Sequence, residues 1–426
     1  MLATLRNAWK VPELKKRIIF TFFMIVLFRM GNFIPVPGID SASISKNLVN
    51  SENLFGFYDL ISGGAFSNFS IFAMGVIPYI NASIIMQLLT VAIPKLEQLS
   101  KEGHEGRQKI QNYTRYAAII FGFVEAFGMY AIIQRTGAVV DSSKLNLFLV
   151  ILTMNTASIF LVWLGEQITT KGIGNGISLI ILINIISRIP QSGVQMFTSA
   201  KLGNIPVVEM ILVTLCIVAL LVVVVAVNLS ERRIPVQYAG KAVGSKVFKG
   251  QSTHIPINIS TSAVIAIIFA TSVMQFPKTI ADFFPNSGFA NFVNKSMFSV
   301  FVPKTWKYIV AFVILILIFS VFYTQITFKP DEMSENMHKS SGFIPGIRPG
   351  EPTTEYLEGV LNKTAILGGL FASIIAIFPI IVSKFTPFDQ LALGGTALLI
   401  VVGVAVETTR QIESQLVMRH YEGFLK

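Results

Sequence analysis

Long apolar runs separated by short polar stretches follow one another along almost the whole chain. A bilayer core of about 30 Å requires roughly 20 mostly apolar residues in a helix, and about ten runs reach or approach this length. The strict alternation typical of a membrane β-barrel strand is absent. We therefore predict an all-α polytopic membrane protein with ten transmembrane helices. The predicted spans lie near residues 18–34, 71–93, 115–134, 145–168, 173–189, 206–228, 256–276, 306–328, 360–381 and 390–410.

The composition agrees with this pattern. The 426 residues are 53% hydrophobic and 13% charged, whereas a soluble chain carries about 25% charged residues. The basic start, MLATLRNAWKVPELKKR, precedes a long apolar run without a small-residue cleavage site, so we expect the first span to be retained. Cys216 is the one cysteine in the sequence, which excludes an intrachain disulfide. The fifth span is short and begins with GIGNG, as expected of a helix that ends near a cavity.

The distribution of basic residues predicts the orientation in the membrane. If the N-terminus is cytoplasmic, the cytoplasmic segments carry 23 of the 34 Lys and Arg residues. This bias predicts that both ends of the chain are cytoplasmic. The basic face has two interpretations. It can serve only to set the topology, or it can dock an acidic partner such as an RNA-rich particle.

Two cytoplasmic loops, at about 229–256 and 329–360, are longer than connections require. In the first, Ile234, Val236 and Tyr238 alternate with other residues, which predicts a short β-ribbon with basic edges rather than a merely solvated hairpin. In the second, GFIPGIRPGEP is rich in Gly and Pro, which predicts a backbone made largely of turns. Arg348 stands within this stretch, where a stiff loop would present its guanidinium to a partner.

The sequence gives no sign of a metal or cofactor site. The third cytoplasmic loop contains HEG, but a metalloprotease HExxH motif would need a second histidine where Gln108 stands. The four histidines are scattered over cytoplasmic segments, at His104, His254, His338 and His420. We therefore expect no metal, no cofactor and no enzymatic activity.

Several motifs in collinear order resemble one family. They are IPVPGID, SIFAMGVIPYINASIIMQLL, WLGEQITTKGIGNGISLII, QSTHIPIN, GFIPGIRPGEPT and GGTALLIVV, and together they resemble SecY, the central subunit of the bacterial protein-conducting channel. The resemblance extends from about Leu14 to Lys426. It implies two pseudo-symmetric five-helix halves, 1–190 and 191–426, around an hourglass pore with a lateral gate to lipid. The two halves are not visibly similar in sequence.

The resemblance also implies a ring of aliphatic side chains at the narrowest point of the pore. Such a ring excludes water and conforms to a passing chain without binding any one side-chain chemistry. Without the resemblance, an isoleucine in a span would be expected to face lipid or to pack. The implied ring residues are Val76, Ile80, Ile177, Ile181, Ile268 and Ile400.

The stretch FYDLISGGAFSNFS, at about 57–70, occupies the position of the family's plug, a short helix that folds into the external funnel below the ring. A re-entrant external loop is the alternative. Its two glycines would weaken a helix by about 1 kcal/mol each, so we expect the plug to be displaced easily. The implied plug residues are Tyr58, Asp59, Leu60, Ile61, Ser62, Gly63, Gly64, Ala65 and Phe66.

The family's lateral gate lies between the second and third helices and the seventh and eighth. The implied gate residues are Asn81, Ser83, Gln87, Ser260 and Thr261, and we expect the two hydroxyls to supply hydrogen-bond partners across the gate. Related sequences carry Asn in place of Ser260. Glu125 stands unexpectedly in mid-span, and Arg29 is expected to snorkel or to pair.

The resemblance implies a passive conduit for unfolded preproteins across, and laterally into, the bacterial plasma membrane. The sequence contains no Walker motif, so the energy would come from partners. These would be the SecA motor ATPase or a translating ribosome, with the small membrane subunits SecE and SecG and with signal sequences as ligands. Docking residues would be Arg348, Arg232, Arg233, Lys241, Lys246 and Lys249. The alternative is a secondary transporter of a small solute, which broken helices and Glu125 favour slightly.

Overall fold

The computed structural model describes residues 6, 8–40, 62–66, 68–203, 206–238, 241–243, 246–248, 252–258, 261–284, 286–295, 299–302, 305–385 and 395–424. Its helices are α2 (Pro12–Gly31), α5 (Ile77–Ala92), α6 (Pro94–Lys101), α7 (His104–Thr136), α8 (Lys144–Lys171), α9 (Gly176–Lys201), α10 (Val207–Leu229), α11 (Thr261–Phe283), α12 (Gly288–Lys295), α13 (Trp306–Phe328), α14 (Pro330–Lys339), α15 (Glu351–Phe385) and α16 (Gly395–Phe424). Its strands are β1 (Glu231–Tyr238), β2 (Lys241–Val243), β3 (Lys246–Phe248), β4 (Ser252–Asn258) and β5 (Gly342–Phe343).

Each predicted span overlaps one long helix, which confirms a helical membrane fold. Within the described ranges, six helices have the length and composition to cross a bilayer, and the pair α5 and α6, bent by 99°, is a seventh if it forms one broken span. The six are α7, α8, α9, α10, α13 and α15. A total of ten spans therefore remains a prediction, and it depends on α2, α11 and α16.

Several predicted boundaries are wrong. The fifth span is not short, because α9 continues through Pro190 to Lys201. The second span does not begin at 71, because Gly75 adopts a left-handed φ of +57° and α5 starts only at Ile77. The second cytoplasmic loop is largely ordered into α14, β5 and the first turns of α15, which starts at Glu351.

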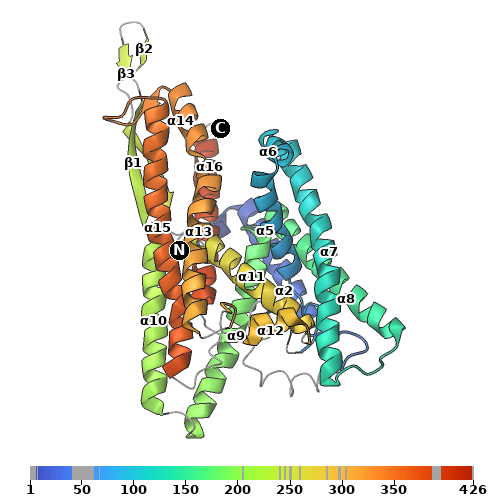
Figure 1. Ribbon diagram of the computed structural model, residues 1–426. Helices are drawn as coiled ribbons and strands as arrows, with labels where there is room; N and C mark the ends of the chain where they lie inside the picture. The colour runs from blue at the N-terminus through green and yellow to red at the C-terminus, as the bar shows by residue number, and fades with distance from the viewer. Residues whose placement is uncertain are drawn as a thin grey trace.

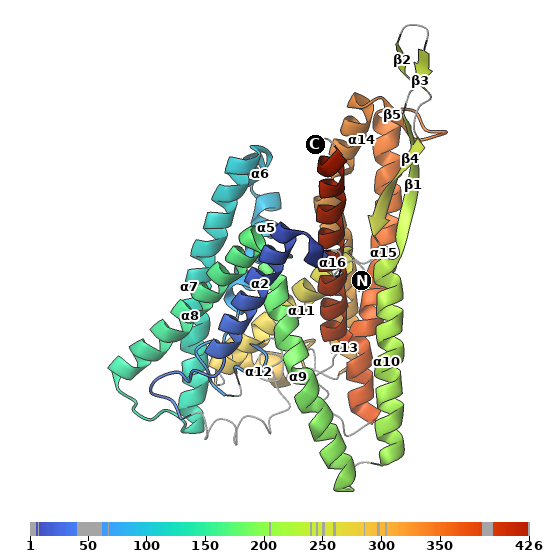
Figure 2. The ribbon, with the colours of Figure 1, turned by 180° about the vertical axis from the view of Figure 1, so that it is seen from behind.

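The helices pack in two groups (Figure 1). In one group α5 packs on α7, α7 on α8, α8 on α9, and α2 on both α8 and α9. In the other, α13 packs on α15 and α11, and α16 packs on α10 and α15. Contacts between the groups include α9 with α16 and α7 with α11. Figure 2 shows the same separation from behind, with α6 and α14 at one end of the molecule.

The predicted β-ribbon is confirmed and is longer than expected. β1 pairs antiparallel with β4, from Glu231 with Asn258 to Gln237 with Ser252, and β5 adds to its other edge. β2 and β3 form the hairpin beyond. Ile234 and Val236 are buried against the start of α15, as the alternation predicted. Residues 256–258 belong to β4, so the seventh predicted span was placed too early.

Candidate functional site

The GIGNG sequence places the first turn of α9 tightly against α8. Asn175 caps the helix, because its Oδ1 accepts hydrogen bonds from the backbone N of Ile177 (3.1 Å) and Ser178 (3.3 Å). A Cβ at Gly176 would lie 1.9 Å from the carbonyl oxygen of Gly165, so only glycine permits this approach. The cap thereby fixes Ile177 and, one turn further on the same face, Ile181.

A second sharp turn positions the start of α5. The left-handed Gly75 ends the preceding turns, and the Ser158 hydroxyl of α8 donates to the Gly75 carbonyl at 2.9 Å. Phe72 stacks between Phe28 and Phe160, with ring centroids 5.8 and 6.3 Å away. Val76, the residue preceding the helix, is consequently 1% exposed. Val76 and Ile80 belong to or pack against the same apolar cluster as Ile177 and Ile181 of α9.

Five of the six predicted ring residues lie in or against one apolar cluster. Val76 and Ile181 are buried members, and Ile80, Ile177 and Ile400 are half-buried and pack against it. The cluster joins α2, α5, α8 and α9 to α16, so it bridges the two helix groups. Ile268 on α11 is half-buried and lies outside this cluster. The structure therefore brings five of the six predicted ring residues together.

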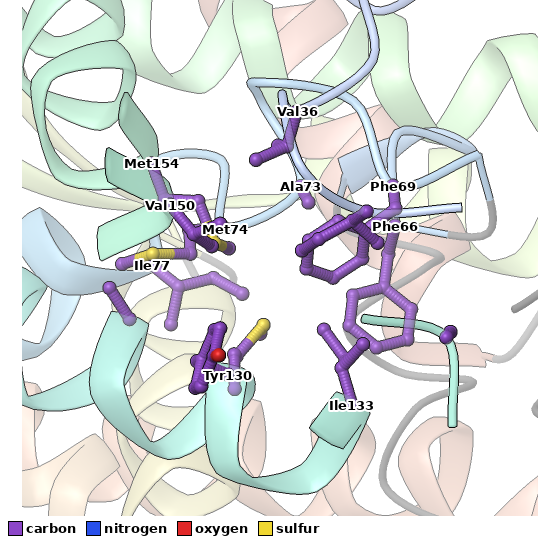
Figure 3. Close-up of a cluster of buried hydrophobic side chains, with 14 residues drawn as sticks. Val36, Phe66, Phe69, Ala73, Met74, Ile77, Tyr130, Ile133, Val150 and Met154 are labelled. Carbon is purple, nitrogen blue, oxygen red and sulfur yellow. The ribbon is translucent and has the colours of Figure 1, made fainter. Parts of the chain in front are cut away.

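The described part of the predicted plug packs directly against this cluster. Ala65 is fully buried within it. Phe66 points the other way, into a second apolar cluster with Val36, Tyr130 and Ile133 (Figure 3). Ser62 is buried, and its hydroxyl accepts a hydrogen bond from the Phe66 backbone N at 3.1 Å. Tyr58, Asp59, Leu60 and Ile61 lie outside the described residues.

The two plug glycines have a role that differs from the predicted one. Gly63 and Gly64 adopt left-handed φ values of +64° and +92°, in a turn rather than a helix. A Cβ at Gly63 would lie 2.7 Å from the Cα of Asn184 on α9. These glycines therefore allow a tight turn to approach α9 closely; at the described positions they do not weaken a helix.

A backbone tether holds the chain just after the plug. Val36 N donates to the Phe69 carbonyl at 3.0 Å, and Ile71 N donates to the Ile34 carbonyl at 2.9 Å. These bonds pair residues 34–36, which follow α2, with residues 69–71. We refer to this pairing as the plug tether. It fixes one end of the plug beside the end of α2.

The polar residues of the predicted lateral gate are satisfied within one helix group. The Asn81 amide donates to Glu125 Oε1 at 2.7 Å, from α5 to α7. Gln87 Nε2 donates to the Ser83 hydroxyl, 3.4 Å away on the same helix. A hydrogen bond between Asn81 and the other side of the gate stays a prediction. Ser260 and the side chain of Thr261 lie outside the described part of the chain.

The backbone of the loop around Arg348 is anchored to the neighbouring strand and helix. Ile344 is buried against β1 and α15, and the Thr353 hydroxyl donates to the Arg348 carbonyl at 2.8 Å. Gly346 and Gly350 adopt left-handed φ values of +85° and +101°. The Arg348 side chain itself is exposed. The backbone is thus anchored while the guanidinium faces solvent, as the sequence predicted.

The other predicted docking residues lie along the sheet. Arg232 and Arg233 are exposed on β1, and Arg233 Nε pairs with Glu231 Oε1 at 2.7 Å. Lys241 and Lys246 belong to the β2–β3 hairpin, but their side chains, like Lys249, lie outside the described part. Among the described residues, no three His, Cys, Asp or Glu side chains could hold a metal ion.

Sequence reasoning missed the contacts of Arg29 and the role of α9 beside the plug. Arg29 Nη1 lies 3.3 Å from the Gly63 carbonyl and 3.1 Å from the Ser187 hydroxyl of α9. The sequence did show that Arg29 lies near the end of a span and has no acidic residue three or four positions away on the same helix. This pattern indicates that its partner lies on another segment. Ser187 carried no signal, because a hydroxyl within a helix commonly bonds its own backbone.

Two groups of packed apolar helices, bridged by an apolar cluster that includes five of the six predicted ring residues, define a helical membrane protein. The SecY family model matches residues 70–409. The chain is 40% identical over 441 residues to the protein translocase subunit SecY of Halalkalibacterium halodurans, covering 100% of both. It is also 40% identical to the SecY subunit of Aquifex aeolicus, covering 99% of both. The chain belongs to the SecY family.

Solved structures agree in fold. A protein-conducting channel matches with a TM-score of 0.67 and 20% identity, covering 94% of this chain and 92% of the other. Sec61 from a canine ribosome–channel complex matches with a TM-score of 0.62 and 20% identity, again covering 94% and 92%.

Proposed function

We propose that this chain is the channel subunit of a bacterial protein translocase, which conducts unfolded preproteins across the plasma membrane and releases hydrophobic segments laterally into it. The observation that carries the proposal is the cluster in which Val76, Ile80, Ile177, Ile181 and Ile400 meet the plug residue Ala65. Family membership and the closed apolar constriction support the same conclusion. The alternative, a transporter of a small solute, gains no support from the relatives.

The physical task of the constriction explains its chemistry. It must hold back ions at rest and yet pass side chains of every kind. Branched aliphatic side chains dewet a narrow neck and form no specific bonds with what passes. We assign Ile268 to this ring as well, because α11 borders the same space and can contribute its side chain when the helix groups separate.

The plug adds a second seal below the constriction. Ala65 fills the cluster from the external side, while Phe66 and the plug tether hold the segment in place. An entering chain must displace Ala65 before it can pass. We propose two halves, 1–190 and 191–426, that move apart at the gate formed by Asn81, Ser83 and Gln87 with Ser260 and Thr261.

Energy must come from partners on the cytoplasmic face. The sequence contains no nucleotide-binding motif, and we propose that a motor ATPase of the SecA type or a translating ribosome supplies the driving force. Their docking surface would be Arg348 with the basic residues of the β-ribbon, Arg232, Arg233, Lys241, Lys246 and Lys249. Subunits of the SecE and SecG type would complete the complex. This assignment requires both termini to be cytoplasmic.

The plug assignment supplies the decisive experiment. Deleting residues 58–68 should leave an assembled channel that conducts ions without substrate, because Ala65 no longer fills the constriction. Single-channel recording in planar bilayers measures this leak, and signal-dependent transport of a preprotein into vesicles measures the remaining function. A deletion that is assembled and as tight as the parent would contradict the plug. If the unmodified complex transports no preprotein, the proposed function is contradicted.

A further inference from the structure

Arg29 joins three segments that are far apart in the sequence. It lies near the end of α2, and its Nη1 is 3.3 Å from the Gly63 carbonyl of the plug and 3.1 Å from the Ser187 hydroxyl of α9. The Ser187 hydroxyl also lies 3.4 Å from the Gly63 carbonyl and 2.7 Å from the Asn184 carbonyl. The guanidinium therefore binds the plug and the helix behind it at the same time.

The charge of Arg29 makes this contact strong. A cation near the end of a membrane helix would normally snorkel to the interface or pair with a carboxylate. Among the described residues, Arg29 instead donates to a carbonyl and a hydroxyl, which are half-buried or buried. Hydrogen bonds from a charged donor are roughly twice as strong as neutral ones. The bond is made to the backbone of residue 63, so it does not depend on a plug side chain.

The position of Gly63 makes the bond specific to the closed state. Gly63 fits against Asn184 only because it has no Cβ, and Ala65, two residues later, fills the apolar cluster of the constriction. Movement of Ala65 out of the cluster must carry Gly63 away from both Arg29 and Ser187. The bond therefore exists while the plug is seated and is lost when the plug leaves.

We propose that Arg29 is a positioning residue that latches the plug in the closed channel, with Ser187 as the second half of the latch. The proposal rests on the plug assigned above. It gives α2, which lies behind the constriction, direct influence over the probability that the channel is sealed. A partner or lipid that displaces the Arg29 guanidinium would unlatch the plug without touching it.

The test is the resting conductance of the intact complex with Arg29→Met. We expect the channel to be open without substrate roughly tenfold more often, which is the effect of one lost charge-assisted hydrogen bond. Arg29→Lys should restore part of the seal, since an ammonium still donates to one oxygen. Ser187→Ala should raise the leak by a smaller factor. The matched control is Arg17→Met, which removes the same charge from the same helix about 18 Å away.

Combining Arg29→Met with the deletion of residues 58–68 separates the latch from the plug. If Arg29 acts through the plug, the double variant leaks no more than the deletion alone. Additive leaks would show that Arg29 holds the helices together instead, and would overturn the latch. A leaking deletion with a tight Arg29→Met channel would overturn the latch and keep the plug, whereas a tight deletion would overturn both. Complex yield in mild detergent confirms that each variant is assembled.

Discussion

At the scale of single residues, the proposed constriction consists of aliphatic side chains that meet across the two helix groups. Ile400 is the member from α16, and it packs against a cluster built mainly from α5, α8 and α9. Burying one branched side chain contributes roughly 1.5–3 kcal/mol relative to exposure. A ligand can shift a closed channel only if the open state lies within a few kcal/mol. One ring residue is therefore a large part of the difference.

Ile400→Asn should loosen the seal and relax substrate selection, because an amide draws water into a dry neck and removes aliphatic contact. The measurement is export of a preprotein with a defective signal sequence, which should rise several-fold. Ile314→Asn on α13 is the matched control, since Ile314 is 50% exposed on the surface of its helix. Equal export in both variants would mean that Ile400 is not part of the ring.

Glu125 is a residue whose unusual position the sequence revealed but whose hydrogen-bond partner it did not. Its position in mid-span was conspicuous, yet its partner Asn81 is 44 residues away and on another helix. The sequence suggested that Asn81 would bond across the gate. The Asn81 amide donates to the carboxyl group of Glu125 on α7, a contact between two helices that no spacing in the sequence indicates.

At the scale of elements, the loop before α15 combines a fixed backbone with a free side chain. Two left-handed glycines shape the turn, Ile344 anchors it, and Arg348 remains exposed. Such a loop loses little conformational entropy when it binds a partner. Its contribution to docking should therefore lie mainly in the guanidinium.

Arg348→Glu should reduce motor-driven transport at least tenfold and leave membrane insertion and assembly unchanged, because the charge is reversed at an anchored, exposed position. Transport of a preprotein into reconstituted vesicles with the motor ATPase measures this effect. Lys339→Glu, a charge reversal on α14 at a side chain that is 66% exposed, is the comparison. If the two variants lose transport equally, general charge on the cytoplasmic face is responsible and Arg348 has no special role.

Helices were easier to predict than the places where they begin and end. Apolar runs located α8, α10 and α13 well, because burial in lipid requires continuous hydrophobicity. The starts of α5 and α15 were wrong, since each is set by turn geometry at Gly75 and Gly350. The plug glycines were interpreted through helix propensity, whereas the close approach to Asn184 determines them. A tertiary contact of this kind leaves no pattern in the sequence.

At the scale of the whole molecule, charged side chains from both helix groups lie at the end of the molecule that carries α6 and α14. On α6, beyond the bend that ends α5, Lys101 Nζ pairs with Glu97 Oε1 at 2.7 Å, and beyond α13, Lys329 Nζ pairs with Glu332 Oε1 at 2.7 Å. The hydrogen bond from Lys101 is the main reason that the pKa of Glu97 lies below its usual value, and Lys329 adds to the effect. The two pairs are therefore within electrostatic reach.

Glu97→Lys should favour separation of the two groups, because it places like charges opposite each other, and Lys329→Glu in the same chain should restore the attraction. Export with a defective signal sequence should rise about twofold in the single variant, since exposed pairs are weak. The rise should disappear at high salt. A salt-independent change, or a double variant no better than the single one, would show that these charges do not bias the gate.

The plug tether has a consequence for how the channel closes again. Because residues 69–71 stay paired with residues 34–36, Ser62 is joined to a fixed point by the seven residues from Ser62 to Asn68, which reach at most about 25 Å. A displaced plug therefore remains at a high effective concentration beside the pore, where short flexible linkers give values in the millimolar range. Resealing is an intramolecular event that requires no partner. Its rate is independent of how many channels the membrane contains, so each channel can close as soon as its own substrate has passed.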